Sequence, residues 1–484
     1  MNSIPSIVDS PLYPIANPKS IAFFGASNKP TTMGTIQFMS MKQLGFAGAV
    51  YPIHPTEKEI LGYRAYQKVS DLPEVPDLAF IVLPTRIVRE TLEACGRKGI
   101  RRAVIVSGGF REVGPEGAEL EEELKKTAAA YGIRFVGPNC IGVVNPHHKL
   151  NPTPFPYEAE PGFIGMASQS GSFVTQMFEY LRPLGLGFST AFSVGNEANI
   201  DLVDCLEYFG RCEKTKVIAL YIEGIRRGRA FIETARAVVP HKPIVALYIG
   251  GTEAGRRAGF SHTAALAGPD ELYEGIFRQS GVIRAASIAE LFDFCWILGT
   301  QPAPQGKRVV IETHSGGPGA NAADAAGRAG LELPILSVAT QEKLRPFFPS
   351  TASISNPVDM TFSRNSQDLF SVIPRIILED EKADVLLLYL VPQSRMMERQ
   401  MRAMGLSAEE ASKLMAQMVE EQVQGVVQLR DRYRKPIVGY TYGWPGDPLH
   451  KRLIAEGLPV FPGPERAAQA IRVLAEYHHH RKTE

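Results

Sequence analysis

The sequence predicts an α/β protein made of doubly wound parallel sheets. Short apolar runs rich in β-branched residues, such as LAFIVLP at 78–84 and VIALYIEG at 217–224, alternate with helical patterns along most of the chain. Such alternation is typical of parallel strands joined by helical crossovers. The chain has 484 residues, and roughly 150 residues form a domain, so we expect three domains, at 1–144, 145–300 and 301–484.

The first domain is expected to be Rossmann-like. Its predicted strands are at 21–27, 48–55, 78–84, 103–110 and 134–142, and its helices at 34–44, 87–99 and 116–131. The turn after the first strand, GASNKPTTMG at 25–34, does not match GxGxxG. It nevertheless has the two features that such a motif supplies. Gly25 permits a tight turn, and a helix N-terminus near Gly34 can hold a phosphate. The residues alone fit any nucleotide-binding domain of this type.

Two flavodoxin-like domains are expected to follow. The second domain has predicted strands at 162–168, 187–195, 217–224, 243–250 and 281–285, with helices beginning near Ser172, Asp201, Gly228, Glu271 and Ser287. A Pro-rich linker at 299–307 precedes the third domain. There we expect a strand, a Gly-rich turn and an Ala-rich helix within 308–331, strands at 385–392, 436–443 and 458–463, and a solvated amphipathic helix at 407–433.

Composition excludes several classes of function. Lys and Arg number 52 against 51 Asp and Glu, a balance that favours neither nucleic acid nor an anionic membrane. The five cysteines lack CxxC or metal-ligand spacing, so we expect buried free thiols and no metal site. The start of the chain has no signal-peptide pattern, and no apolar run approaches 18 residues. A cytoplasmic location is therefore expected.

The segment at 251–268, GTEAGRRAGFSHTAALAG, is the candidate reactive loop. It follows a predicted strand, at the end where open α/β sheets bind ligands. Small residues dominate it and leave His262 as its only nucleophile or base at neutral pH. Taken alone, the pattern fits either a catalytic histidine or one that hydrogen-bonds at a turn.

Three further strand ends carry candidate chemistry. Ser170, Gly171 and Ser172 stand where a strand passes into a helix, and they could hold a phosphoryl group or simply cap the helix. Glu223 places a carboxylate at the end of an apolar strand. A Gly-rich turn opens the first helix of the third domain through Gly316, Gly317 and Gly319.

SHTAALAG at 261–268 resembles the SHTGALAG loop of the NDP-forming acyl-CoA synthetases, relatives of the succinyl-CoA synthetase alpha subunit. The resemblance implies that His262 becomes phosphorylated during turnover. It implies that Glu223, in a YxEG motif, holds the imidazole. It also implies that the helix N-termini at Ser170–Ser172 and at the HSGGPG turn (314–319) face the phosphohistidine.

The first domain resembles the CoA-binding domain of the same family through GASNKPTTMG, YPIHP, VLP and VGPNCIGVVNP. This likeness places Gly25, Ala26, Ser27 and Gly34 at the CoA pyrophosphate, Pro52, Pro55, Val82 and Pro84 at the adenosine, and Lys58 at the 3′-phosphate. The chain departs from the family pattern at His54 and His314 (commonly Asn), at Tyr248 and Gly251 (commonly basic), and at Ala264 and Ser355 (Gly).

The resemblance implies the reversible reaction acid + CoA + ATP to acyl-CoA + ADP + phosphate. The three expected sheets leave no length for an ATP-grasp unit, and the chain has no GxxxxGK[ST] motif. We therefore expect a hetero-oligomer in which a separate ATP-grasp beta subunit binds ATP or ADP with Mg²⁺. The alternatives are a CoA-binding regulatory protein and an ATP-independent acyl or carbamoyl transferase. The acid is expected to be a small carboxylic acid.

Overall fold

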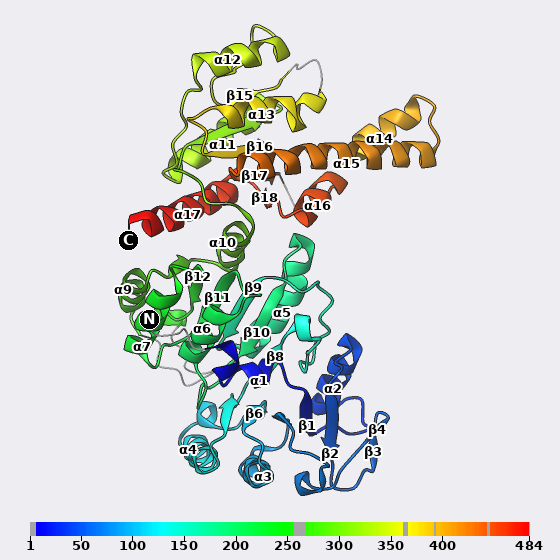
Figure 1. The fold of residues 1–484 in the computed structure, drawn as a ribbon, viewed down its shortest axis with the longest axis vertical. Coiled ribbons are helices and arrows are strands. Elements are labelled where there is room, and N and C mark those ends of the chain that lie inside the picture. The colour runs from blue at the N-terminus through cyan, green and yellow to red at the C-terminus, as the bar shows by residue number, and fades with distance from the viewer. Residues whose placement is uncertain (1–5, 256–267, 362–365, 392–393, 443–445, 484) are drawn as a thin grey trace. The chain divides into compact units, whose positions relative to one another are not determined.

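The computed structural model describes residues 6–255, 268–361, 366–391, 394–442 and 446–483. The chain divides into two compact units, Met1–Leu291 and Phe292–Glu484. The first unit holds two large sheets and the second holds one (Figure 1), which confirms the predicted α/β class. The division falls inside α10 (Ile288–Thr300), just before the Pro-rich linker. The partition into three domains stays a prediction.

The first sheet has the order β2-β1-β5-β6-β7, and all its pairs are parallel. Its strands are β1 (Ser20–Phe24), β2 (Ala49–Ile53), β5 (Leu78–Ile81), β6 (Arg102–Ile105) and β7 (Arg134–Val136), and its helices are α2 (Met33–Leu44), α3 (Thr85–Lys98) and α4 (Pro115–Ala130). These are the predicted elements, with helix ends shifted by up to two residues. The sequence did not predict α1 (Tyr13–Ala16) or the small hairpin β3 (Glu59–Ile60) and β4 (Tyr63–Arg64).

The second sheet has the order β13-β12-β11-β9-β10-β8. Its elements are β8 (Val143–Val144), β9 (Ile164–Ser168), β10 (Phe188–Ser193), β11 (Val217–Ile222), β12 (Ile244–Tyr248), β13 (Ile283–Ala285), α5 (Gly171–Leu181), α6 (Leu202–Arg211), α7 (Gly228–Val238) and α9 (Asp270–Ser280). All five expected strands are present. The additional strand, β8, pairs antiparallel with β10.

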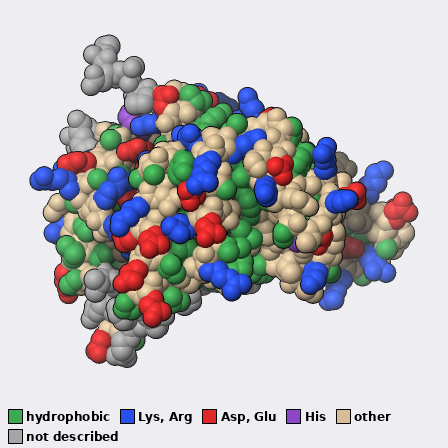
Figure 2. All heavy atoms as spheres, turned by 90° about the horizontal axis from the view of Figure 1, so that it is seen from below, with side chains coloured by type: hydrophobic (Ala, Val, Ile, Leu, Met, Phe, Trp, Pro, Cys, Tyr) green, Lys and Arg blue, Asp and Glu red, His purple; other side chains and the backbone are tan. Residues whose placement is uncertain are grey.

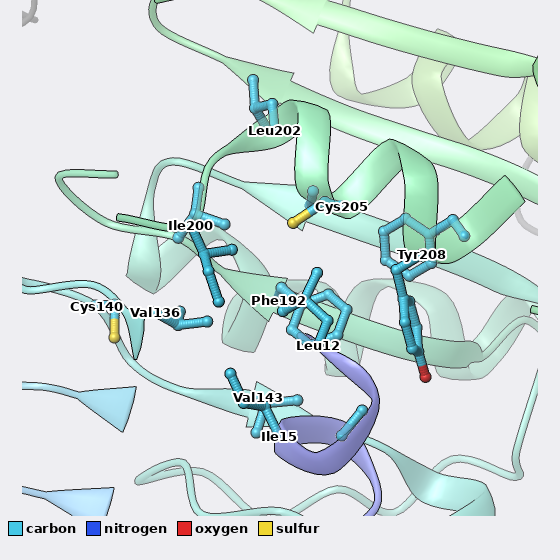
Figure 3. Close-up of a cluster of buried hydrophobic side chains, with 14 of the residues drawn as sticks. Leu12, Ile15, Val136, Cys140, Val143, Phe192, Ile200, Leu202, Cys205 and Tyr208 are labelled. Carbon is cyan, nitrogen blue, oxygen red and sulfur yellow. The ribbon is translucent and has the colours of Figure 1, made fainter. Parts of the chain in front are cut away.

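A shared core joins the two sheets of the first unit. Ile15 of the unpredicted helix α1 and Leu12, the residue just before it, point toward Val143 of β8 and Phe192 of β10 (Figure 3). Tyr208 of α6 packs edge-on against Phe192, with ring centroids 5.3 Å apart. Val136 of β7, in the first sheet, belongs to the same buried cluster, so burial of these apolar side chains joins the N-terminal segment to both sheets. Within the first unit, the two sheets therefore share one hydrophobic core.

The second unit contains a sheet of order β15-β14-β16-β17-β18, with parallel pairs throughout. Its elements are β14 (Val309–Thr313), β15 (Val358–Asp359), β16 (Val385–Tyr389), β17 (Ile437–Thr441), β18 (Val460–Pro462), α11 (Gly316–Arg328), α12 (Val338–Leu344), α13 (Val372–Glu379), α14 (Ser394–Ala403), α15 (Ala408–Tyr433), α16 (Pro448–Ala455) and α17 (Pro464–Thr483). The long charged helix α15 begins with a capping box between Ser407 and Glu410, and it buries one apolar stripe.

Surface and thiol properties agree with the composition. On the face shown in Figure 2, acidic and basic side chains are interspersed. The five cysteines are free and buried, as expected. In the part of the chain that the structure describes, no helix is both long and apolar enough to span a bilayer. Among the same residues, no cluster of His, Cys, Asp and Glu could hold a metal ion.

Candidate functional site

The strand order of the second sheet creates a ligand-binding position at β9. β9 is the first of the parallel strands along the chain, and the next two, β10 and β11, lie on opposite sides of it. In open α/β sheets, ligands bind beyond the carboxyl ends of the strands at such a switch point. Tyr221 pairs in register with Ser168, and Ile222 pairs with Tyr248. The turn at Ser170, Glu223 and the start of the histidine segment therefore leave the sheet at one edge.

Gln169 connects β9 to Glu223, and the sequence analysis did not single it out. Its side-chain oxygen accepts hydrogen bonds from the backbone N–H groups of Glu223 and of Gly224, the latter at 3.0 Å. Its amide nitrogen donates to the Gly224 carbonyl at 2.7 Å. The pairing between β9 and β11 ends at Ser168 and Tyr221, and beyond it the Gln169 side chain makes the hydrogen bonds that hold the backbone at Glu223. Gln169 is the residue that precedes Ser170, so these hydrogen bonds join the backbone at Glu223 to the start of that turn.

The turn at Ser170 leaves the start of α5 without a side-chain cap. Ser168 donates to the Ser170 carbonyl at 2.7 Å and accepts from the Ser170 N–H at 3.1 Å. Ser170 occupies the N-cap position, but its side chain makes no capping hydrogen bond. Ordinary helix capping, the alternative considered for Ser170, is therefore not what the structure shows. The first-turn N–H groups at Gly171 and Ser172 can receive an anion.

The Gly-rich turn in the second unit has the same construction. Thr313 donates to the Ser315 carbonyl at 3.0 Å and accepts from its N–H at 3.3 Å, and Ser315 makes no side-chain cap. α11 then begins at Gly316. A Cβ at Gly319 would meet the Thr313 side chain at 2.8 Å, whereas Gly317 faces open space. Two [ST]-x-S-G sequences therefore build the same uncapped turn, one in each unit.

His262 and residues 256–267 lie outside the described residues, so its predicted role stays a prediction. The residues that flank this segment are described. Tyr248, which stands where the family has a basic residue, is buried and donates its hydroxyl proton to the Gly268 carbonyl at 2.8 Å. A Cβ at Gly251 would collide with the carboxylate of Asp270. Both ends of the segment are thus held near the end of β12.

Glu197 is buried behind Gln169. One of its carboxylate oxygens accepts from the Gln169 amide at 2.6 Å, and the other accepts from the Leu202 N–H at 2.9 Å. Arg226 lies 3.8 Å away. Burial raises the pKa of Glu197 to about 7, although the Gln169 hydrogen bond opposes the shift. Glu197 holds the amide that holds Glu223, so it supports the site indirectly.

The raised pKa predicts a specific pH dependence of stability. The folded protein binds a proton at Glu197 more tightly than the unfolded chain, so this stabilisation is complete below the ordinary pKa of 4.5 and is lost as pH rises through about 7. We expect the free energy of unfolding of the wild type, relative to Glu197→Gln, to fall by about 3 kcal/mol between pH 4 and pH 8. Urea titrations at both pH values measure this, and a constant difference would contradict it.

Asn196 and Asn199 connect the loop before α6 to the first sheet and its helices. Asn196 donates to Glu112 at 2.6 Å and to Glu121 at 2.9 Å. Asn199 accepts from Arg134 at 2.8 Å. None of these three partners contacts Gln169 among the hydrogen bonds of the described residues. Only Glu197 of this polar stretch reaches toward Glu223, among the contacts that the described residues make.

The residues predicted to bind CoA gather at the carboxyl edge of the first sheet, after strands β2, β1 and β5. Gly25 has φ +101°, and a Cβ there would collide with the Val82 carbonyl. A Cβ at Gly34 would collide with the Gly25 carbonyl, so the turn packs directly on α2. The turn is closed by Thr35, which accepts the Ser27 N–H at 2.9 Å. Ala26 and Pro52 are buried, whereas Pro55, Lys58 and Pro84 are exposed.

His54, where the family commonly has Asn, makes a side-chain contact within the turn after β2. Its Nδ1 accepts the Glu57 backbone N–H at 3.0 Å. Asn side chains stabilise turns by accepting such a backbone N–H group. The exchange therefore preserves the turn after β2, which leads to Lys58. Assignment of CoA-binding roles to this edge stays a prediction.

Comparisons with known proteins match both sheets of the first unit. A family model described as "CoA binding domain" matches residues 19–146, and one described as "Succinyl-CoA ligase like flavodoxin domain" matches residues 161–298. Together they cover the CoA-binding edge and the Gln169 site.

Whole-chain relatives extend the match. The chain is 38% identical over 462 residues to acetate–CoA ligase [ADP-forming] II subunit alpha of Pyrococcus furiosus, covering 95% of this chain and 96% of that protein. It is 38% identical over 460 residues to acetate–CoA ligase [ADP-forming] I of Archaeoglobus fulgidus, covering 95% of this chain and 63% of that protein. The solved dinucleotide-forming acetyl-coenzyme A synthetase 1 of Ca. Korarchaeum cryptofilum, in complex with phosphate and ADP, aligns with a TM-score of 0.85, at 33% identity over 97% of each chain.

Proposed function

The chain belongs to the family of ADP-forming acyl-CoA ligases. From this premise we propose that it is an alpha-type subunit. The reaction that we propose converts an acid, CoA and ATP reversibly into acyl-CoA, ADP and phosphate. One observation carries the proposal at the level of the site. Gln169 fixes the backbone at Glu223 beside the uncapped turn at Ser170. This arrangement offers a carboxylate for an imidazole and a positive helix end for a phosphoryl group.

The chemistry requires an activated acid, because a carboxylate oxygen is a poor leaving group. In the proposed sequence, a ring nitrogen of His262 attacks the γ-phosphorus of ATP and ADP leaves. The acid's carboxylate then takes the phosphoryl group from His262, forming an acyl phosphate and restoring the ring. The CoA thiolate attacks the acyl carbon and phosphate leaves. The Glu223 carboxylate accepts a hydrogen bond from the N–H of the other ring nitrogen and supports the positive charge that develops on the ring.

The proposed partner is a separate ATP-grasp beta subunit. The Pyrococcus relative, which this chain matches over 96% of its length, is named a subunit alpha. The Archaeoglobus relative is longer, since the match covers 63% of it. We propose that the beta subunit binds ATP with Mg²⁺, which neutralises the phosphate charge. The helix N-termini at Ser170–Ser172 and at Gly316–Gly319 are proposed to stabilise the phosphoryl group on His262. The proposed substrate is a small carboxylic acid. The proposed location is the cytoplasm.

The CoA assignment predicts a selective effect at Lys58. This side chain is exposed beyond β2, where it would neutralise the 3′-phosphate of CoA. We expect Lys58→Ala to weaken CoA binding by about tenfold and to leave the affinity for 3′-dephospho-CoA unchanged. Lys68→Ala removes another exposed lysine of the same domain and serves as the matched control. Calorimetric titration of the wild type and of both variants with each of the two ligands checks this, and an equal loss for both ligands would contradict it.

Labelling tests the proposed function directly. The chain is incubated with γ-labelled ATP and the candidate ATP-grasp subunit, and the expected result is an acid-labile, base-stable label on this chain. CoA binding without any label would indicate a regulatory protein instead. Acyl transfer from acyl-CoA to phosphate without ATP would indicate a transferase.

A further inference from the structure

Two buried tyrosines stack at the edge of the second sheet, next to the proposed site. Tyr248 is the last residue of β12, and Tyr273 lies in the first turns of α9. Their ring centroids are 3.6 Å apart and the rings are inclined by 12°. Only 7% of Tyr248 and 4% of Tyr273 is exposed. The family pattern has a basic residue at position 248, so the stack depends on a feature in which this chain departs from it.

Each hydroxyl of the pair bonds to a different backbone segment. Tyr248 donates to the Gly268 carbonyl at 2.8 Å. Tyr273 accepts the Ile225 N–H at 3.2 Å. Gly268 ends the predicted histidine segment, and Ile225 lies two residues after Glu223. The stacked rings therefore connect the backbone near the orienting carboxylate to the backbone at the end of the histidine segment.

The surroundings hold the pair in place. A Cβ at Gly268 would lie 3.1 Å from the Tyr273 ring, so this ring packs closely on the Gly268 backbone. At the start of α9, Asp270 forms an ion pair with Arg284 of β13, which holds this end of the helix against the sheet. With ring centroids this close and rings nearly parallel, the two tyrosines lie almost face to face, an arrangement less favourable than offset stacking. The two hydroxyl bonds therefore help to select this arrangement.

Glu223 is held from two directions by these contacts. On the β9 side, Gln169 binds its backbone N–H. On the α9 side, Tyr273 binds the N–H of Ile225. The backbone from which the Glu223 carboxylate extends is therefore held on both sides, which restricts the region that the carboxylate can reach. The Tyr248 hydroxyl extends the same constraint to Gly268.

We propose that Tyr248 and Tyr273 are positioning residues for phosphoryl transfer, because the pair fixes the end of the histidine segment at Gly268 relative to Glu223. The inference rests on the proposed function, since it assigns the pair a role in phosphorylation of His262. Neither ring is assigned a contact with the substrates. The effect of the pair should therefore appear in the rate of phosphorylation, with the affinity for CoA and the KM for ATP unchanged.

Two conservative variants separate this role from simple packing. Tyr248→Phe and Tyr273→Phe each remove one hydroxyl and keep the stacked rings. In the complex with the ATP-grasp subunit, we expect each to slow labelling by γ-labelled ATP about three- to tenfold. Because the two bonds act through one stack, the double variant should lose less than the product of the two single losses. Tyr433→Phe is the matched control, since it removes a hydroxyl that donates to Glu379 in the other unit.

The outcomes separate this inference from the proposed function. If the wild-type complex takes no acid-labile label, the phosphohistidine function fails and the positioning role fails with it. If the wild type is labelled and both Phe variants are labelled at the same rate, only the positioning role is overturned. Losses that multiply without coupling, or that match a loss of CoA affinity, would also overturn it.

Discussion

His262→Asn is expected to abolish phosphorylation of the chain and to lower acyl-CoA synthesis in the reconstituted complex on the order of 10⁴-fold or more. Asparagine keeps a polar group of similar reach but has no nucleophilic ring nitrogen, so no phosphoryl intermediate can form on it. The direct transfer that remains would need ATP and the acid to meet in one site. The measurement is the amount of acid-labile label on the chain, together with the turnover of acid, CoA and ATP.

Two other histidines serve as controls for this variant. His241 is exposed and follows α7, so His241→Asn should retain full labelling. His314 stands in the uncapped turn of the second unit, where burial lowers its pKa. His314→Asn restores the residue common in the family and should also retain an acid-labile label. Wild-type labelling of His262→Asn, or loss of label in His314→Asn alone, would contradict the assignment of the phosphoryl carrier.

The sequence was sufficient to predict the long, buried strands and their helices. Runs such as 217–222 are apolar on both faces, which is typical of strands buried in a parallel sheet, and they appear at the expected positions as β11 and its neighbours. It was insufficient for β8 and α1. These are short segments whose structure depends on distant partners, as Val143 and Ile15 depend on packing beside Phe192. A local pattern carries no such long-range information.

The candidate site divides in the same way. Glu223 and Ser170 were named as candidates because both stand at strand ends, a position that the local sequence indicates; their roles stay predictions. Gln169 was missed even though it lies between two serines of that motif, because its role appears only when β9 and β11 are neighbours. Tyr248 was noted as a lost cation. Its function as a stacked ring depends on Tyr273, which follows 25 residues later in the sequence, and no local spacing indicates that contact.

Glu223→Gln is expected to slow phosphorylation of His262 on the order of 10³-fold. The amide carbonyl can still accept a ring N–H, but it cannot support the positive charge that develops on the imidazole as its other nitrogen bonds to phosphorus. The amide can also present its own N–H to the ring and select the wrong tautomer. The fold should be retained, because Gln169 binds the backbone N–H of residue 223 and not its side chain.

The decisive measurement for Glu223→Gln is the single-turnover rate of labelling, since that step involves neither CoA nor the acid. CoA affinity and the midpoint of thermal unfolding should match the wild type. Glu213→Gln is the matched control, because Glu213 is exposed and precedes the opposite end of the same strand, β11. If both variants were labelled at the wild-type rate, a carboxylate at 223 would have no part in phosphoryl transfer. If Glu223→Gln lost CoA affinity as well, its effect would be structural. The hydrogen bonds from Gln169 to the backbone at residues 223 and 224 would then have to depend on the charge of Glu223.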